Sequence, residues 1–255
     1  MSFLSGIFKR NKNRAPRCCA VIAAAGSSQR MAGEDKLLAL ICGKPVLEHV
    51  LDAFQQCGIV DEIIVVTRED LMGRVSELCG AGSFNKVSKV MTGGGSRLES
   101  VLTGALAASK NMDLIAIHDG ARPCIDAAVI ERAINAAAKL HAAAPAVKIS
   151  STIKKVDNNI VINTVDRDSL YEIQTPQVFD AGLIKAALTN AAQKQVEITD
   201  DCMAAELIGI PVHITEGSRS NIKITTPDDL IIAEAILSRG AQCAPPRKER
   251  SPVCE

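Results

Sequence analysis

Residues 18–36 read CCAVIAAAGSSQRMAGEDK, and this stretch decides how the start of the chain folds. Its apolar half, CCAVIAAA, predicts a buried β-strand. The apolar run ends at Gly26, which two serines follow, and Arg30 and Lys36 come soon afterwards. Such a loop is either a tight turn or an anion-binding loop, in which backbone amides and cations face a group such as phosphate. Its spacing matches neither the Walker phosphate loop nor the glycine fingerprint of dinucleotide sites.

Strand-like and helix-like segments alternate through the following part of the chain. Strands are predicted at residues 61–67, 86–92, 113–120 and 143–150, and the one at residues 113–120 is a strong core strand. Helices are predicted at residues 45–58, 69–80 and 93–110, and an alanine-rich helix at residues 126–143. Because short connections between parallel strands need crossover helices, this alternation predicts an α/β fold with a mostly parallel, doubly wound sheet.

The alternation of strands and helices breaks between about residues 150 and 177. The sequence STIKKVDNNIVINTVDR, residues 151–167, alternates on both sides of an Asp-Asn-Asn turn and predicts a β-hairpin. We expect this hairpin, at about residues 150–170, to leave the body as an arm and to meet a second subunit.

Charge and composition limit the functions that the chain can have. It has 255 residues with 29 basic and 29 acidic side chains, five phenylalanines, one tyrosine and no tryptophan. A general nucleic-acid binder needs a positive excess or aromatic stacking platforms, so this composition argues against one. The nine cysteines are odd in number and lack C-x-x-C spacing, which predicts neither a zinc site nor a disulfide framework. We expect a reducing, cytoplasmic compartment.

One domain, at residues 18–239, is predicted between two tails. Residues 1–17 are basic and contain no acid, which indicates a frayed terminus or, alternatively, a weak contact with a membrane surface. The apolar runs are too short for a signal peptide or a membrane span, so we expect no stable membrane insertion. Residues 240–255 are rich in proline and charge, and they predict a disordered tail.

Three polar clusters follow predicted strands, at residues 26–36, 93–100 and 118–122. Ligands of wound sheets collect at the carboxyl ends of strands, so we expect these clusters to form one site. In GGGSRLES, residues 93–100, the glycines form either a flexible turn or a surface for a flat base, with Ser100 offering a hydroxyl. Asp119, in HDGARP, suits a ribose hydroxyl or Mg²⁺, or else it caps the turn that follows.

The second half of the chain adds basic and hydroxyl side chains. Each of them alone is more simply a surface residue. Together they suit a second, phosphorylated and hydroxylated substrate, and the set comprises Thr152, Arg167, Thr175 and Lys223 with Asp119 and Arg122.

Seven motifs occur in the following order along the chain: AAAGSSQRM…K, LEHVLDAF, GGGSRLESV, HDGARP, TVDRDSLYEIQTPQVF, ITDD and EGSRSNIKITTPDDLIIAE. With these motifs the chain resembles the 2-C-methyl-D-erythritol 4-phosphate cytidylyltransferase family from about residue 20 to residue 237. The resemblance implies a Rossmann-like nucleotidyltransferase fold and a homodimer formed through the β-arm. It also implies that CTP and a polyol phosphate, 2-C-methyl-D-erythritol 4-phosphate, give the cytidine diphosphate derivative and pyrophosphate with the help of Mg²⁺.

The resemblance implies roles for individual residues. Those implied to surround the nucleotide are Ala24, Ala25, Gly26, Gly94, Ser100 and Asp119, with Asp119 also the metal ligand. The catalytic cations around the triphosphate are Arg30, Lys36 and Lys223. The sugar phosphate would meet Arg122, Thr175 and Lys223, together with Thr152 and Arg167 from the partner's arm.

Two other functions stay open as alternatives. Ribitol-5-phosphate cytidylyltransferases share the fold, CTP and much of the HD…RP and QTPQ pattern, although HDGARPCI and NIKIT favour the methylerythritol family. A non-catalytic nucleotide-binding protein is a remote alternative, because it predicts the loss of Arg30, Lys36 or Asp119, and all three are present. A nicotinamide-dependent oxidoreductase is disfavoured, since the glycine fingerprint is missing.

Overall fold

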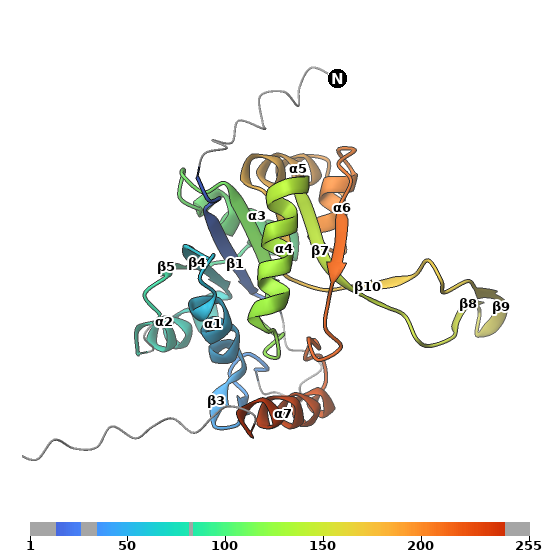
Figure 1. Ribbon diagram of the computed structural model, residues 1–255, viewed down its shortest axis with the longest axis horizontal. Helices are drawn as coiled ribbons and strands as arrows, with labels where there is room; N and C mark the ends of the chain where they lie inside the picture. Colours follow the sequence, from blue (N-terminus) through green and yellow to red (C-terminus); the bar gives the residue numbers. More distant parts are fainter. Residues whose placement is uncertain (1–13, 27–34, 82–83, 243–255) are drawn as a thin grey trace, which may run out of the picture.

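The computed structural model describes residues 14–26, 35–81 and 84–242 (Figure 1). Its central sheet runs in the order β10-β7-β11-β6-β1-β4-β5, and β12 pairs with β7. The strands of this sheet are β1 (Cys18–Ala24), β4 (Glu62–Thr67), β5 (Val87–Thr92), β6 (Leu114–Asp119), β7 (Ala142–Lys148), β10 (Tyr171–Ile173), β11 (Gln177–Asp180) and β12 (His213–Glu216). The pairs β1–β4, β1–β6, β4–β5 and β7–β12 are parallel, whereas β10 and β11 run antiparallel to their neighbours. The sheet is mainly parallel, as the sequence predicted.

Helices cover both faces of this sheet (Figure 1). Successive side chains of a strand point to opposite faces, so Ala20 and Ile22 of β1 pack in one core cluster and Cys19 and Val21 in the other. The first cluster receives side chains from α1 (Val46–Gln56), α2 (Met72–Ala81), which follows the short helix η1 (Glu69–Leu71), α4 (Ala127–Leu140) and α7 (Pro227–Gln242). The second cluster receives side chains from α3 (Arg97–Ala107), α5 (Ala181–Gln193) and α6 (Asp201–Glu206). The predicted doubly wound arrangement is therefore confirmed.

The alanine-rich helix predicted at residues 126–143 is shorter in the structure. Its start is well defined, because the Asp126 side chain accepts a hydrogen bond from the backbone N–H of Val129 at 3.0 Å. It ends at Leu140, where His141 takes a φ of 73° and the chain leaves the helix. The alanines from Ala142 onwards belong to β7, so the prediction for the last residues of this helix is wrong.

Two small sheets stand beside the central one. One joins β2 (Leu40–Ile41) to β3 (Lys44–Pro45), and the other is the hairpin of β8 (Ile153–Asp157) and β9 (Ile160–Val165). Asn158 and Asn159 form its turn with φ values of 45° and 63°, which asparagine tolerates better than most residues. The hairpin extends away from the layered body in Figure 1, and Ile160 at its tip is 69% exposed. Its role at a subunit interface stays a prediction.

The two predicted tails, residues 1–17 and 240–255, lie mostly outside the described residues. Among the helices of the described ranges, none combines the length and the apolar character that crossing a membrane requires.

Candidate active site

A cavity of about 600 Å³ lies where β1, β4, β5 and β6 end. Its lining contains the described residues that the resemblance implied for the nucleotide and its phosphates, namely Ala24, Ala25, Gly26, Lys36, Gly94, Ser100, Asp119 and Lys223. Arg30 belongs to the same predicted set and lies outside the described residues. The structure thus brings together side chains from all three polar clusters that the sequence placed after separate strands.

The glycine turn before α3 is a hydrogen-bonded structure that lines the cavity. Ser100 Oγ accepts a hydrogen bond from the N–H of Gly94 at 3.1 Å and donates one to the carbonyl of Ser96 at 2.9 Å. A Cβ atom at Gly93 would collide with the Ser100 hydroxyl and with the Ala25 side chain, so this close approach requires glycine. The turn is therefore shaped by its own hydrogen bonds.

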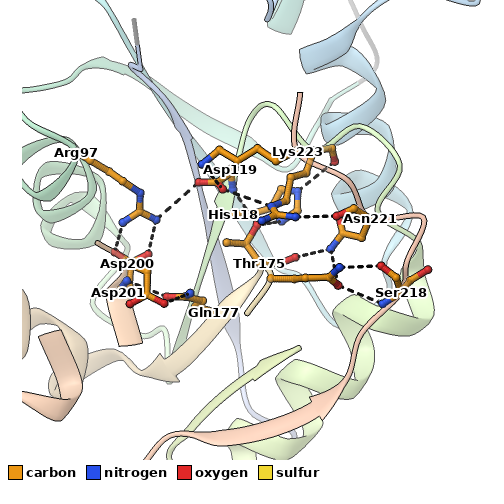
Figure 2. A network of polar contacts seen from close by, with 12 residues as sticks. Arg97, His118, Asp119, Thr175, Gln177, Asp200, Asp201, Ser218, Asn221 and Lys223 are labelled. Atoms are coloured by element: carbon orange, nitrogen blue, oxygen red, sulfur yellow. Dashed lines mark hydrogen bonds and ion pairs between the residues drawn. The ribbon is translucent and has the colours of Figure 1, made fainter. Parts of the chain in front are cut away.

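Asp119 ends β6 inside the cavity and is surrounded by three cationic side chains (Figure 2). Its Oδ2 atom lies 2.9 Å from Lys223 Nζ and 3.4 Å from Arg122 Nε. Its Oδ1 atom lies 3.7 Å from Arg97 Nη2. Burial opposes ionisation of this carboxyl, which is 7% exposed, but the charges of the three cations outweigh burial and lower its pKa. Asp119 is therefore an anion held by three separate parts of the chain.

Arg97, at the first position of α3, makes a two-pronged ion pair with Asp201 at the first position of α6. Nη1 and Nη2 of Arg97 lie 2.9 Å and 2.7 Å from the two carboxylate oxygens (Figure 2). Gln177 Oε1 accepts hydrogen bonds from the backbone N–H groups of Asp201 and Cys202, both at 2.9 Å, which fixes the start of α6. Planar forks of this kind set the direction of a guanidinium as well as its charge. The pair ties the glycine turn to α6 across the cavity edge.

Neither Arg97 nor Asp201 was among the site residues predicted from the sequence. Both stand in quoted motifs, Arg97 inside GGGSRLES and Asp201 at the end of ITDD. An acidic pair in one quoted motif and an unassigned arginine in another were the signal that could have found them. Arg68, which directly follows β4 and lines the cavity, was missed as well, although a cation after a buried strand is the same signal.

A buried network lies behind Asp119. Thr175 Oγ1 accepts a hydrogen bond from the backbone N–H of Asp119 at 3.2 Å and lies 2.9 Å from His118 Nδ1. Asn221 Nδ2 donates to the carbonyl of Thr175 at 2.9 Å, and Arg122 Nη1 donates to the carbonyl of Asn221 at 2.7 Å. Burial lowers the pKa of His118 to about 4, so its ring is neutral at neutral pH. The network fixes the end of β6, which carries Asp119.

The residues predicted for the second substrate fall into two groups. Arg122, Thr175 and Lys223 each contact Asp119 directly, and of these three residues Lys223 lines the cavity. Thr152 and Arg167 are exposed beside the hairpin and are not among the residues that line the cavity. The Arg167 guanidinium donates a hydrogen bond to the carbonyl of Ser150 at the base of the hairpin. A single chain therefore does not bring these two groups into one site.

The side chains around Asp119 are compatible with a divalent cation that arrives with phosphate. Within the described ranges, no three His, Cys, Asp or Glu side chains gather as a ready-made metal site. Mg²⁺ commonly takes one or two carboxylates from the protein and its remaining oxygen ligands from phosphates and water. Asp119, ionised and inside the cavity, supplies a carboxylate of that kind.

Comparison with known proteins gives a consistent result. The family model described as 2-C-methyl-D-erythritol 4-phosphate cytidylyltransferase matches residues 18–239. A protein of that name from Halalkalibacterium halodurans is 41% identical over 219 residues, which cover 86% of this chain and 96% of the relative. A second one, from Clostridium acetobutylicum, is 41% identical over 226 residues, covering 88% and 98%.

Solved structures agree with the sequence comparison. The crystal structure of 4-diphosphocytidyl-2C-methyl-D-erythritol synthase from Anaerococcus prevotii matches with a TM-score of 0.78 at 34% identity, covering 89% of this chain and all of the other. The Thermus thermophilus 2-C-methyl-D-erythritol 4-phosphate cytidylyltransferase matches with a TM-score of 0.71 at 30% identity, covering 86% and 98%. The fold, the site and the relatives together establish that the chain belongs to the 2-C-methyl-D-erythritol 4-phosphate cytidylyltransferase family.

Proposed function

We propose that the chain transfers CMP from CTP to 2-C-methyl-D-erythritol 4-phosphate, giving 4-diphosphocytidyl-2-C-methyl-D-erythritol and pyrophosphate in isoprenoid precursor synthesis. Membership of the family supports this reaction. One observation carries it: a single cavity is lined by the glycine turn, the end of β1, Lys36, and Asp119 with its cations. These are the parts that a nucleoside triphosphate needs, with backbone beside the base and cations beside the phosphates.

The chemistry explains the composition of the cavity. A phosphate oxygen of the second substrate attacks the α-phosphorus of CTP, the new P–O bond forms, and the bond to the β-phosphate breaks to release pyrophosphate. An ionised phosphate needs no general base to attack. The barrier then falls through alignment of the two substrates and through fixed cations near the charge that develops on the oxygens. A cavity rich in Arg and Lys suits this reaction.

We assign the residues to the two substrates as follows. Ala24, Ala25, Gly94 and Ser100 would surround the cytosine, and Gly26 and Asp119 would meet the rest of the nucleotide. Arg30, Lys36 and Lys223 would bind the triphosphate and act as the catalytic cations. The observation that supports the assignment is that the described members of this set line one cavity.

The sugar phosphate would bind at the end of the cavity where Arg122, Thr175 and Lys223 meet Asp119. We infer that Thr152 and Arg167 reach the same end from the hairpin of a second subunit, so that the working unit is a homodimer. Two features support this inference: both residues are exposed in the single chain, and the hairpin carries exposed apolar side chains, including Ile160 and Ile162.

Asp119 would hold Mg²⁺ together with the phosphate oxygens of CTP, where the ion would draw charge from the α-phosphate and the leaving pyrophosphate. The three cations around Asp119 oppose metal binding in the absence of phosphate. In electron paramagnetic resonance, we expect Mn²⁺ to bind more tightly to the chain with CTP than to the chain alone or to CTP alone, and Asp119→Asn to abolish the gain over CTP alone. The cysteine pattern supports a cytoplasmic location.

Pyrophosphate release tests the function directly. The purified chain is given CTP and Mg²⁺ with 2-C-methyl-D-erythritol 4-phosphate, ribitol 5-phosphate, or neither. We expect turnover with the first sugar phosphate and a kcat/KM at least about a hundredfold lower with the second. Preference for ribitol 5-phosphate would establish the alternative enzyme, and CTP binding without any turnover would establish a non-catalytic nucleotide-binding protein.

A further inference from the structure

Arg68 joins two segments of the cavity lining that are distant from β4 along the chain. It follows the last residue of β4, and its side chain is 25% exposed in the ion pair with Asp35. Nη1 donates to the carbonyl of Gly26 at 2.9 Å, and Nη2 donates to Asp35 Oδ2 at 2.6 Å. Nε and Nη2 also donate to the two carboxylate oxygens of Asp70, each at 3.0 Å. One guanidinium therefore contacts the end of β1, the residue before Lys36, and η1.

Asp35 links Arg68 to the backbone around Lys36 through further hydrogen bonds. Its second carboxylate oxygen, Oδ1, accepts a hydrogen bond from the N–H of Leu37 at 2.9 Å. Its carbonyl accepts hydrogen bonds from the N–H groups of Leu38 and Ala39, both at 3.0 Å. Leu37 is fully packed in the core on the other side. The backbone of Lys36 is thus held between an anchored carboxylate and a buried leucine.

We propose that Arg68 is a positioning residue for CTP: through Asp35 it fixes the turn that carries Lys36, so that this lysine faces the triphosphate. The inference rests on the proposed function, in which Lys36 binds the triphosphate. A side chain held within a fraction of an ångström stabilises a transition state far better than one that must be ordered on binding.

Direct contact between Arg68 and phosphate is the competing explanation. A guanidinium has five N–H donors, and the contacts to Gly26, Asp35 and Asp70 already use four of them. A phosphate that took more than the one remaining N–H would have to displace an existing partner such as Asp35, at 2.6 Å, and would leave that carboxylate beside the anionic ligand. The geometry therefore favours action through Asp35.

The two explanations predict opposite effects for Asp35→Asn. This substitution keeps an oxygen that accepts from Leu37 N–H and removes the charge that holds Arg68. If Arg68 binds phosphate directly, loss of a nearby negative charge frees the guanidinium and tightens CTP binding. If Arg68 acts through Asp35, we expect Asp35→Asn and Arg68→Ala each to weaken CTP binding about tenfold, with no further loss in the double variant.

The experiment is isothermal titration of CTP with Mg²⁺ into the full chain, with thermal unfolding of every variant as a check on folding. Asp70→Asn is the matched control, because Asp70 pairs with the same guanidinium but does not contact the turn that carries Lys36; we expect affinity within about twofold of wild type. In a Lys36→Ala background, Arg68→Ala should not lower the affinity for CTP any further. If Arg68→Ala merely destabilised the fold, it would lower the unfolding temperature in that background as well.

The outcomes separate this inference from the proposed function. Tighter CTP binding by Asp35→Asn, or additive losses in the double variant, would overturn the positioning role. Unchanged affinity in Arg68→Ala would overturn it too. Failure of the wild-type chain to bind CTP would instead refute the proposed function. If Lys36→Ala loses affinity for CTP and Arg68→Ala does not, the proposed function stands and Arg68 has no role in it.

Discussion

Lys223 Nζ lies 2.9 Å from Asp119 Oδ2, so a lysine from the segment before α7 neutralises the carboxylate at the end of β6. Arg97 and Arg122 approach the same carboxylate, and Asp201 balances Arg97. These three cations and two carboxylates together carry one net positive charge, and Lys36 adds another to the lining of the cavity. Such a site attracts a polyanion, and a phosphate that reaches it competes with Asp119 for the same cations. The resting contact therefore keeps the cations aligned before the ligand arrives.

Lys36→Ala tests the cation that lines the cavity beside β1. We expect kcat/KM to fall about a thousandfold, because a cation aimed at charge that develops in the transition state is lost. Steady-state pyrophosphate release measures the effect. Lys44→Ala is the control, since Lys44 is half exposed and pairs with Asp52 away from the cavity, and it should keep wild-type turnover. Near-normal turnover in Lys36→Ala would remove this lysine from the mechanism.

Much of this architecture could be predicted from the sequence, because the signals are local. The apolar runs of β4 and β6 are buried along their whole length, and that of β1 is buried except at the partly exposed Ala23, as central parallel strands require. The end of α4 could not be predicted in the same way. Alanine favours helix, but Ala142 and Ala143 pair with neighbouring strands, and this tertiary pairing outweighs the propensity.

The candidate site could likewise be predicted only where the signal is local in the sequence. Asp119 and Lys36 stood out because each is a charged residue that follows an apolar strand within a motif. The roles of Arg97 and Arg68 depend on partners that are distant along the chain, Asp201 and Asp35, and no local pattern pairs them. Only the fold shows which carboxylate holds which guanidinium.

His118 should make stability depend on pH. Burial lowers its pKa to about 4 from an ordinary value of 6.5. Between these values, the unfolded chain binds a proton that the folded chain excludes, so the free energy of unfolding falls as the pH falls through this window. The full effect is about 3 kcal/mol. Urea unfolding at several pH values measures it, and the slope should be weaker in His118→Gln than in the control His213→Gln, whose histidine is exposed. Equal slopes in the two variants would contradict the assignment.

Asp201→Asn tests the ion pair that ties the glycine turn to α6. Asp201 is fully buried and is the two-pronged partner of Arg97, so its neutralisation leaves this guanidinium with only the longer contact to Asp119, at 3.7 Å. We expect the free energy of unfolding to fall by about 3 kcal/mol. Asp168→Asn, which removes a surface pair with Lys148, should cost less than about 1 kcal/mol. Similar losses in the two variants would show that the buried pair adds nothing beyond a surface contact.

Arg167→Ala tests the division of labour between the two substrates. We expect KM for the sugar phosphate to rise at least about tenfold, because an arginine fork to phosphate is lost, while KM for CTP changes by less than about twofold. Lys155→Ala, on the exposed face of the same hairpin, is the matched control and should change neither constant. Equal losses for both substrates would contradict the assignment of Arg167 to the sugar phosphate.

Mixed dimers decide which subunit supplies Arg167. A dimer of one Lys36→Ala chain and one Arg167→Ala chain contains one intact site if each cavity uses the partner's Arg167, because the Arg167→Ala chain keeps its own Lys36. If each cavity uses its own Arg167, every site in that dimer is defective. In the structure Arg167 is exposed and hydrogen-bonded to Ser150 at the base of the hairpin, outside the cavity lining. We therefore expect that mixing the two impaired variants raises activity, measured at a low concentration of the sugar phosphate, above that of either variant alone. Gel filtration should show the dimer in both variants, and absence of recovery in confirmed mixed dimers would refute a shared site.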